Sequence, residues 1–281
     1  MPSRSAARQP LRASAPLARL ALLAAAGSLA ALAAGTAHAQ AFDAVRLFGA
    51  APGESGGTVG AALISAHAYA GSNERWNRIF PLLDYQWNNG WFAGTSNGIG
   101  VDLSHDPQDQ YGLRVTADLG RKEDRSTALA GMGDIDMRPE VGGFFNHFVS
   151  REIFLTSSLR YGSGNDRKGL IADLGAGYST ALAPQWRIGL SLATSYVNSN
   201  YMQSNFGVTA AQAATSGYAL STPGAGLRDV RSSAALTYVV SPRFTMTGVL
   251  NVTALLGDAK SSPLTTQKNS VNGIFGIAYG F

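Results

Sequence analysis

The residues best suited to catalysis are three histidines, His67, His105 and His147, which lie beyond the first 39 positions of the chain. Histidine is a general base beside serine or aspartate in many hydrolases, and it also binds metal ions. None of the three lies in a His-Glu-x-x-His motif, and the chain has no phosphate-binding glycine loop. Cysteine is absent, which excludes thiolate metal sites and cysteine nucleophiles. We therefore expect no catalytic residue, no metal, no cofactor and no enzymatic activity.

A second candidate for chemistry is the acidic pair Asp134 and Asp136, which follows the glycine-rich stretch 131–133. Two carboxylates on a tight loop could hold a cation. A calcium loop, however, needs six to eight oxygen ligands, more than this segment supplies. The sequence therefore favours a turn or a cap over a metal site.

Further charged side chains recur at alternate positions of segments that have the pattern of β-strands. If the strands form a barrel, alternation directs these side chains into its lumen. The set consists of Asp84, Asp102, Arg114, Asp118, Arg160, Asp173, Arg187, Arg231 and Arg243. One interpretation is that they pair across strands and brace a narrow interior; the other is a selective pore. Neither sign dominates, so no strong ion preference is expected.

The segments that would position these charges have the two-residue period of strands, most clearly at the C-terminus. There Phe275, Ile277, Tyr279 and Phe281 alternate with smaller residues. A terminal aromatic resembles the signal by which the outer-membrane assembly machinery recognises its clients, and we assign these four residues to it. A soluble sandwich has the same period, so strand length and loop asymmetry must separate the two architectures.

The pattern predicts twelve strands, most of them about ten residues or longer, which is the length that spans a bilayer. We place them at 57–70, 78–87, 90–97, 99–104, 110–119, 138–149, 152–161, 168–181, 185–197, 227–240, 242–255 and 271–281. Their connections alternate between short turns and long loops, as in outer-membrane proteins. The predicted fold is therefore all-β, a single transmembrane antiparallel β-barrel of about 12 strands.

The longest predicted loop runs from Tyr201 to Leu227, and its stretch 208–214 could form a short helix over or inside the barrel mouth. Aromatic residues near the strand ends predict two girdles at the membrane interfaces. They are Tyr85, Trp87, Trp91, Tyr111, Tyr161, Tyr178, Trp186, Tyr196, Tyr238 and Tyr279.

The N-terminus resembles a secretory signal peptide. Arginines precede an apolar run over 20–34, and the small-x-small pattern Ala37-His38-Ala39 supplies a cleavage site, so we assign residues 1–39 to the signal. Residues 40–56 form a periplasmic lead segment, and 57–281 form the barrel. Four of the 22 basic residues lie in the signal, which leaves 18 against 18 acidic ones. The basic pI therefore gives no support for nucleic-acid binding.

Ordered motifs along the predicted barrel resemble those of one known family, the outer-membrane proteins named after the MltA-interacting protein and OmpV. The motifs are Pro81, Asp84-Tyr85, Trp87, 89–94, Tyr111-Gly112 with Arg114, 133–136, 206–209, 216–218, 226–229, 256–259, 262–264 and 279–281. The resemblance implies a barrel. For the founding member it implies a scaffold that joins a lytic transglycosylase to a peptidoglycan synthase, whereas other relatives are associated with adhesion, stress responses or uptake.

We therefore expect a Gram-negative outer-membrane protein in contact with outer-membrane lipid and the barrel assembly machinery. The leading hypothesis is a non-enzymatic scaffold for peptidoglycan synthesis and remodelling enzymes, with a lytic transglycosylase and a peptidoglycan synthase as partners and the periplasmic turns as the docking surface. The alternative is a channel, a porin-like uptake protein or an adhesin.

Overall fold

The structure is a computed structural model that describes residues 55–281. The assigned signal peptide at 1–39 lies outside the described residues. So does all of the assigned lead segment 40–56 except its last two positions.

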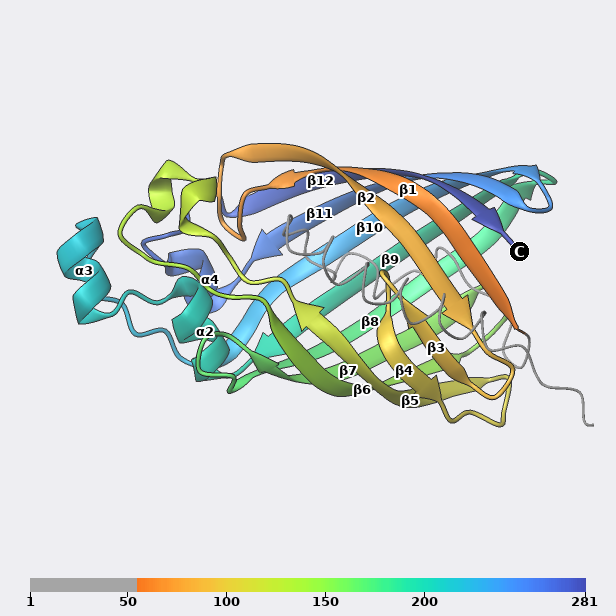
Figure 1. Ribbon diagram of the computed structural model, residues 1–281, viewed down its shortest axis with the longest axis horizontal. Coiled ribbons are helices and arrows are strands. Elements are labelled where there is room, and N and C mark those ends of the chain that lie inside the picture. Colours follow the sequence, from red (N-terminus) through yellow and green to blue (C-terminus); the bar gives the residue numbers. More distant parts are fainter. Residues whose placement is uncertain (1–54) are drawn as a thin grey trace, which may run out of the picture. The chain divides into compact units, whose positions relative to one another are not determined.

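Twelve antiparallel strands form a closed barrel in which each strand pairs with its neighbours in sequence and β1 pairs with β12 (Figure 1). The strands are β1 Gly56–His67, β2 Arg75–Gln86, β3 Trp91–Gly94, β4 Gly98–Asp102, β5 Asp109–Asp118, β6 Arg138–Phe148, β7 Ile153–Ser163, β8 Gly169–Ala183, β9 Trp186–Val197, β10 Gly226–Ser241, β11 Phe244–Leu255 and β12 Asn269–Gly280. The predicted fold class is confirmed.

The connections differ sharply between the two ends of the barrel. At the end that holds the C-terminus they are short turns, such as 184–185 and 242–243. The longest of the other connections, 119–137, 198–225 and 256–268, lie at the opposite end and carry the helices (Figure 1). This asymmetry places the short turns in the periplasm and the long loops outside the cell.

The helical segments are short and belong to the long loops. They are η2 Glu123–Arg125, η3 Thr127–Leu129, α2 Ser199–Phe206, α3 Ala210–Ser216 and α4 Gly257–Ser261. The helix expected at 208–214 is present as α3, two residues further along, and α2 was not expected. Across residues 55–281, no helix is long and apolar enough to span a membrane.

Side chains alternate between an apolar outer surface and the barrel interior. On β12, Phe275, Ile277 and Tyr279 are exposed on the outer surface, and Ala278 is buried. Phe281, directly after the strand, is exposed as well. Their proposed role as an assembly signal stays a prediction.

The aromatic residues are distributed unevenly between the two ends of the barrel. The girdle is dense at the periplasmic end, where Tyr85, Trp87, Trp91, Tyr111, Tyr178, Trp186, Tyr238 and Tyr279 lie. Tyr161 and Tyr196 are near the extracellular ends of β7 and β9. Of the two predicted girdles, the periplasmic one therefore holds most of the aromatic side chains.

The hairpin of β3 and β4 is shorter than the sequence predicts. We expected strands over 90–97 and 99–104, whereas the paired segments are Trp91–Gly94 and Gly98–Asp102. These are the shortest strands of the barrel. They close the wall between β2 and β5 only in its periplasmic half.

Polar side chains end this hairpin early by binding back to β2. The Leu83 amide donates a hydrogen bond to the Thr95 hydroxyl at 3.1 Å, and the Ser96 hydroxyl donates one to Asp84 at 2.5 Å. Gly98 completes the turn with a φ of +76°, a conformation that glycine adopts without strain.

Two leucines on the outer surface of β10 test the position of the membrane. Leu236 lies near the middle of the strand and is 43% exposed, and Leu227 lies at its extracellular end and is 48% exposed. A cation is costly at the bilayer midplane and nearly neutral at the interface. Leu236→Arg should therefore lower the free energy of unfolding in lipid vesicles by ~2–4 kcal/mol, and the control Leu227→Arg by about 0–1 kcal/mol. Urea titration measures both, and equal costs would contradict the assigned membrane position.

Candidate functional site

The extracellular mouth of the barrel is covered by a lid, which we define as loops 68–74, 119–137, 198–225 and 256–268. Its main element is α2. Asn198 caps this helix by accepting a hydrogen bond from the Tyr201 amide at 3.0 Å. The same side-chain oxygen accepts the Leu170 amide at 3.0 Å, so the cap also fastens the helix to β8.

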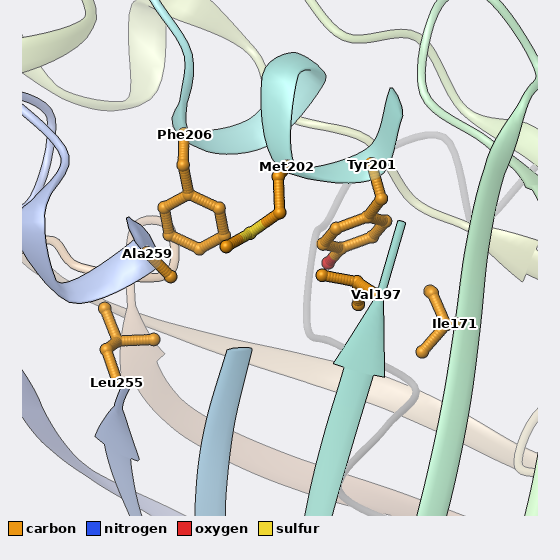
Figure 2. Packing of buried hydrophobic residues seen from close by; sticks show 7 residues of the cluster. All are labelled: Ile171, Val197, Tyr201, Met202, Phe206, Leu255 and Ala259. Atoms are coloured by element: carbon orange, nitrogen blue, oxygen red, sulfur yellow. The ribbon is translucent and has the colours of Figure 1, made fainter. Parts of the chain in front are cut away.

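The inner face of α2 packs on the ends of the strands, as Figure 2 shows. Tyr201, Met202 and Phe206 point from the helix toward strand residues and toward Ala259 of α4. The full cluster is Ile171, Val197, Tyr201, Met202, Phe206, Leu255 and Ala259. The Ser262 hydroxyl, buried beside it, donates to the Phe206 carbonyl at 2.6 Å. Burial of the two largest apolar side chains, Met202 and Phe206, contributes about 1.5–3 kcal/mol each.

A second apolar cluster joins the four loops of the lid to one another. Its members are Ala68, Tyr69, Leu129, Met132, Val208 and Leu264. The Tyr69 hydroxyl donates to the Leu264 carbonyl at 2.8 Å, and Gln212 Nε2 donates to the Met132 carbonyl at 2.7 Å. Burial raises the pKa of Tyr69 above its usual value, which keeps the hydroxyl protonated as a donor. The lid is thus packed like the core of a globular domain.

Below the lid, buried charges form a chain across the inner wall of β6, β7, β8 and β10. Arg160 bridges two carboxylates, with Nη1 at 3.1 Å from Glu140 and Nη2 at 2.8 Å from Asp173. Asp173 also accepts from Arg231 at 3.0 Å, and Arg231 reaches Asp229 at 2.9 Å. The Ser195 hydroxyl donates a short hydrogen bond to Asp173.

A β-bulge extends this chain of charges to the lid. The register of β10 against β9 shifts between Leu227 and Asp229, so Arg228 is an extra residue and both Arg228 and Asp229 are buried. The Arg228 Nε atom lies 2.5 Å from Asp229, and Nη1 lies 2.7 Å from the hydroxyl of Tyr201 on α2. Burial raises the pKa of this phenol, with Arg228 opposing the rise.

We call the chain of charges the ion network, namely Glu140, Arg160, Asp173, Arg231, Asp229 and Arg228. It holds three cations and three anions, each bound to a partner of opposite sign. Buried charges are costly unless they are paired and hydrogen-bonded, and here they are both. Through the Arg228 contact with Tyr201 the network also links the barrel wall to α2. That it braces the interior, the first of the two interpretations of the lumen charges, stays a prediction.

Arg160, Asp173 and Arg231 were in the predicted set, and the structure brings them together. Glu140, Arg228 and Asp229 were missed. Glu140 lies at one of the alternate positions of β6 whose side chains face the lumen, so strict alternation along the strand could have identified it. Arg228 and Asp229 lie at the bulge, which breaks the two-residue period, although both belong to a motif shared with the resembling family.

The predicted aspartates outside the network accept hydrogen bonds near strand ends. Asp84 accepts from Ser96, and Asp102 accepts from Ser104 and from Gln110 Nε2, the latter at 2.7 Å. These side chains fix local turns and strand pairs.

Asp118 instead joins two loops of the extracellular end. It accepts from the amides of Gly120, at 3.0 Å, and Gly164, at 3.2 Å. The carboxylate thereby links the loop that follows β5 to the loop that follows β7.

The remaining arginines of the predicted set have different surroundings. Arg114 is buried, with its guanidinium 5.6 Å from the centre of the Phe144 ring, and Arg187 is exposed at the periplasmic end of β9. Arg243 was expected in the lumen but lies outside it. It belongs to the turn before β11, where strand alternation does not apply, and donates to the Tyr279 hydroxyl on the outer surface at 3.3 Å.

The acidic pair of the 119–137 loop binds a lysine. Lys122 Nζ lies 2.9 Å from Asp134 and 3.3 Å from Asp136, and these contacts raise the pKa of the lysine. Glu123 accepts the amides of the neighbouring Gly131 and Gly133. In the part of the chain that the structure describes, no group of three or more acidic or histidine side chains could hold a metal ion.

The histidines lie at opposite ends of the barrel. His67 contacts Asn272 near the extracellular end, and His147 pairs with Asp109 at 2.7 Å near the periplasmic end, where His105 is also located. One match to Gly-x-Ser-x-Gly does occur at 53–57. Its Ser55 directly precedes strand β1, whereas a nucleophile elbow leads from a strand into a helix. The match therefore lacks the context for catalysis.

Comparison with known proteins gives one family and several structural likenesses. The family model of the MltA-interacting protein MipA matches residues 59–281. A search of curated proteins found no match. Among solved structures, the NanC porin is 9% identical with a TM-score of 0.47, covering 78% of this chain and 98% of its own. The KdgM porin is 10% identical with a TM-score of 0.43, covering 80% and 99%. The outer-membrane channel DcaP of Acinetobacter baumannii is 8% identical with a TM-score of 0.39, covering 81% and 96%.

Arg160 tests the ion network. Arg160→Met leaves Glu140 and Asp173 buried without their shared cation, so the free energy of unfolding should fall by about 3–5 kcal/mol. Lys122→Met removes a cation of the exposed lid surface and should leave stability nearly unchanged. Urea unfolding in vesicles compares the two variants, and equal small losses would show that the network is not a brace.

The lid itself can be tested by conductance. The intact barrel should show no steady current in a planar bilayer, because the packed loops of the lid cover its extracellular mouth. Replacing 199–216 with a short Gly-Ser linker removes α2 and α3 and should produce a conducting pore. A wild-type barrel that conducts as strongly as the variant would contradict a sealed mouth.

Proposed function

The chain belongs to the family of the MltA-interacting protein MipA, and on that premise we propose that it is a non-enzymatic scaffold for murein-processing enzymes. Its closed barrel and apolar outer surface place it in the outer membrane of a Gram-negative bacterium. From there its periplasmic turns face the murein layer, where such enzymes act.

The observation that carries the proposal is the packed lid. Its buried Met202 and Phe206 pack α2 onto the strand ends at the extracellular mouth, and the Arg228 bond to Tyr201 fastens the helix there. An outer-membrane barrel whose mouth is covered in this way is better suited to holding a partner than to transport. The channel alternative is supported by the polar wall of the lumen, and the conductance experiment on the lid separates the two.

The periplasmic turns supply a surface suited to a protein partner. They span 87–90, 103–108, 149–152, 184–185 and 242–243. Exposed cations and anions alternate across them, among them Asp106, Arg151 and Glu152, and Trp87 adds an exposed aromatic ring. A mixed polar rim around a few aromatic anchors is typical of transient protein interfaces.

The family name supports a lytic transglycosylase as the class of partner. We propose that the periplasmic turns bind a lytic transglycosylase of the MltA type, and that a peptidoglycan synthase binds beside it. Holding both enzymes on one anchor would raise their concentration relative to each other and keep cleavage close to synthesis. The barrel contributes position and proximity, and its partners contribute the chemistry.

Two exposed arginines at the periplasmic end test this proposal. Arg151→Glu with Arg187→Glu reverses the rim charge and should weaken binding of an MltA-type lytic transglycosylase about tenfold or more. The matched control, Arg167→Glu with Lys260→Glu, makes the same charge change on the extracellular side and should bind like the wild type. Surface plasmon resonance on the barrel in nanodiscs measures the dissociation constants. Absence of wild-type binding, or equal loss in the control, would overturn the proposal.

A further inference from the structure

One strand edge in the barrel wall lacks a partner. β2 pairs with β1 along its whole length, but its other edge pairs with β3 only over Asp84–Gln86. Leu83 adds a last backbone hydrogen bond with Thr95. Over Arg75–Leu82, in the part of the chain that the structure describes, no strand lies on this edge.

The facing strand is incomplete in the same place. β4 pairs with β5 only as far as Val115, so residues 116–118 of β5 have a partner on one side alone. Above this gap the loops meet again, because the Thr127 hydroxyl donates to Glu74 at 2.9 Å. We call the region between β2, β5, the hairpin turn 95–97 and these loops the window. It lies in the extracellular half of the wall, at the level of the outer leaflet.

The outer side of the window exposes apolar and polar backbone surface together. Ile79 is 75% exposed, the highest value among large apolar side chains of the described residues. Unpaired amides and carbonyls are costly in hydrocarbon, so this edge needs polar groups close to it. Pro81 lacks an amide hydrogen, and proline and charged residues on an edge discourage the addition of another strand. The proline therefore disfavours a second β-strand as the occupant.

The inner side of the window is apolar, which is unusual in a lumen. Trp76 and Phe80 of β2 form an edge-to-face pair with ring centres 6.2 Å apart. They pack against a buried cluster on the inner wall of β1, β2, β10, β11 and β12. That cluster consists of Ala62, Ile64, Leu82, Ala235, Val249 and Ile274. The lumen thus has an apolar wall beside the window and the ion network on the wall formed by β6 to β10.

A cation lies beside this apolar wall. The Arg78 guanidinium lies 5.8 Å from the centre of the Trp76 ring. Arg78 is also exposed, so its guanidinium can bind an anion while its stem stays on the aromatic ring.

We propose that the window binds a phosphorylated, acylated lipid of the outer leaflet, with phosphate on Arg78 and an acyl chain that passes Ile79 on the outer side and reaches Trp76 and Phe80 on the inner side. The head group would also supply polar partners for the unpaired backbone of β2. The proposal depends on the location in the outer membrane and not on the periplasmic scaffold.

The chain has no cysteine, so a single label can report on the window. The variant Ile79→Cys, labelled with an environment-sensitive fluorophore, is titrated with lipid A in detergent. We expect a saturable blue shift, with an affinity about tenfold weaker for dephosphorylated lipid A and for Arg78→Gln in the labelled protein. Arg78→Lys should recover part of the affinity, and Arg167→Gln on the loop after β7 should match the parent.

The same substitution distinguishes the other occupants. An equal shift with phosphatidylethanolamine would show ordinary lipid contact and overturn the proposal, as would the absence of any saturable change. If two unlabelled copies of the Ile79→Cys variant form a disulfide that lipid A does not prevent, the edge belongs to a second copy of the chain and the proposal is wrong. Heat-modifiable migration on gels confirms that each variant is folded, because a closed barrel resists unfolding until it is heated.

Discussion

The rest of this structure depends on one constraint, namely that the backbone amides and carbonyls within lipid need hydrogen-bond partners. A polar backbone group without a partner costs several kcal/mol in hydrocarbon, which leaves a closed ring of strands as the available solution for a β-protein. Pairing of β1 with β12 closes the ring and fixes which side chains face lipid. Once that alternation is set, inward residues gather in a narrow space, where charges must pair. The ion network and the apolar wall are the two ways in which the interior is filled.

The bulge on β10 connects this wall to the lid. Without the extra residue, Arg228 and Asp229 would point to opposite sides, and one of them would face lipid. With it, both are buried, and Arg228 reaches the Tyr201 hydroxyl on α2. The bulge thus allows Arg228, which pairs with Asp229 inside the barrel, to hold α2 as well. The same helix is the main element of the lid, so the scaffold proposal, which rests on the lid, depends on a backbone irregularity of one residue.

Much of the fold could be predicted from the sequence because lipid on one side of the wall makes the two-residue period unusually regular. All twelve strands were placed, and ten have nearly the predicted bounds. The exceptions are β3 and β4, where hydrogen bonds from Thr95 and Ser96 shorten the hairpin. Three of the six network residues were predicted. The bulge removes Arg228 and Asp229 from the strand alternation, whereas Glu140 lies at an inward-facing position that strict alternation could have identified. α2 could not be predicted, because its apolar face is short and is buried only by the ends of strands that are distant in the sequence.

The lid has a consequence for the order of folding events. Tyr69 and Leu264, whose contact joins two of its loops, are separated by 195 positions in the chain, and the contact of His67 with Asn272 spans 205. Contacts of such long range are slow to form, because the entropy of closing the intervening chain must be lost first. In this barrel the pairing of β12 with β1 already closes the intervening chain. The ends of the two loops are then close together, and the entropy of closing that chain need not be lost a second time. We therefore expect the loops of the lid to pack on one another only after the barrel has closed.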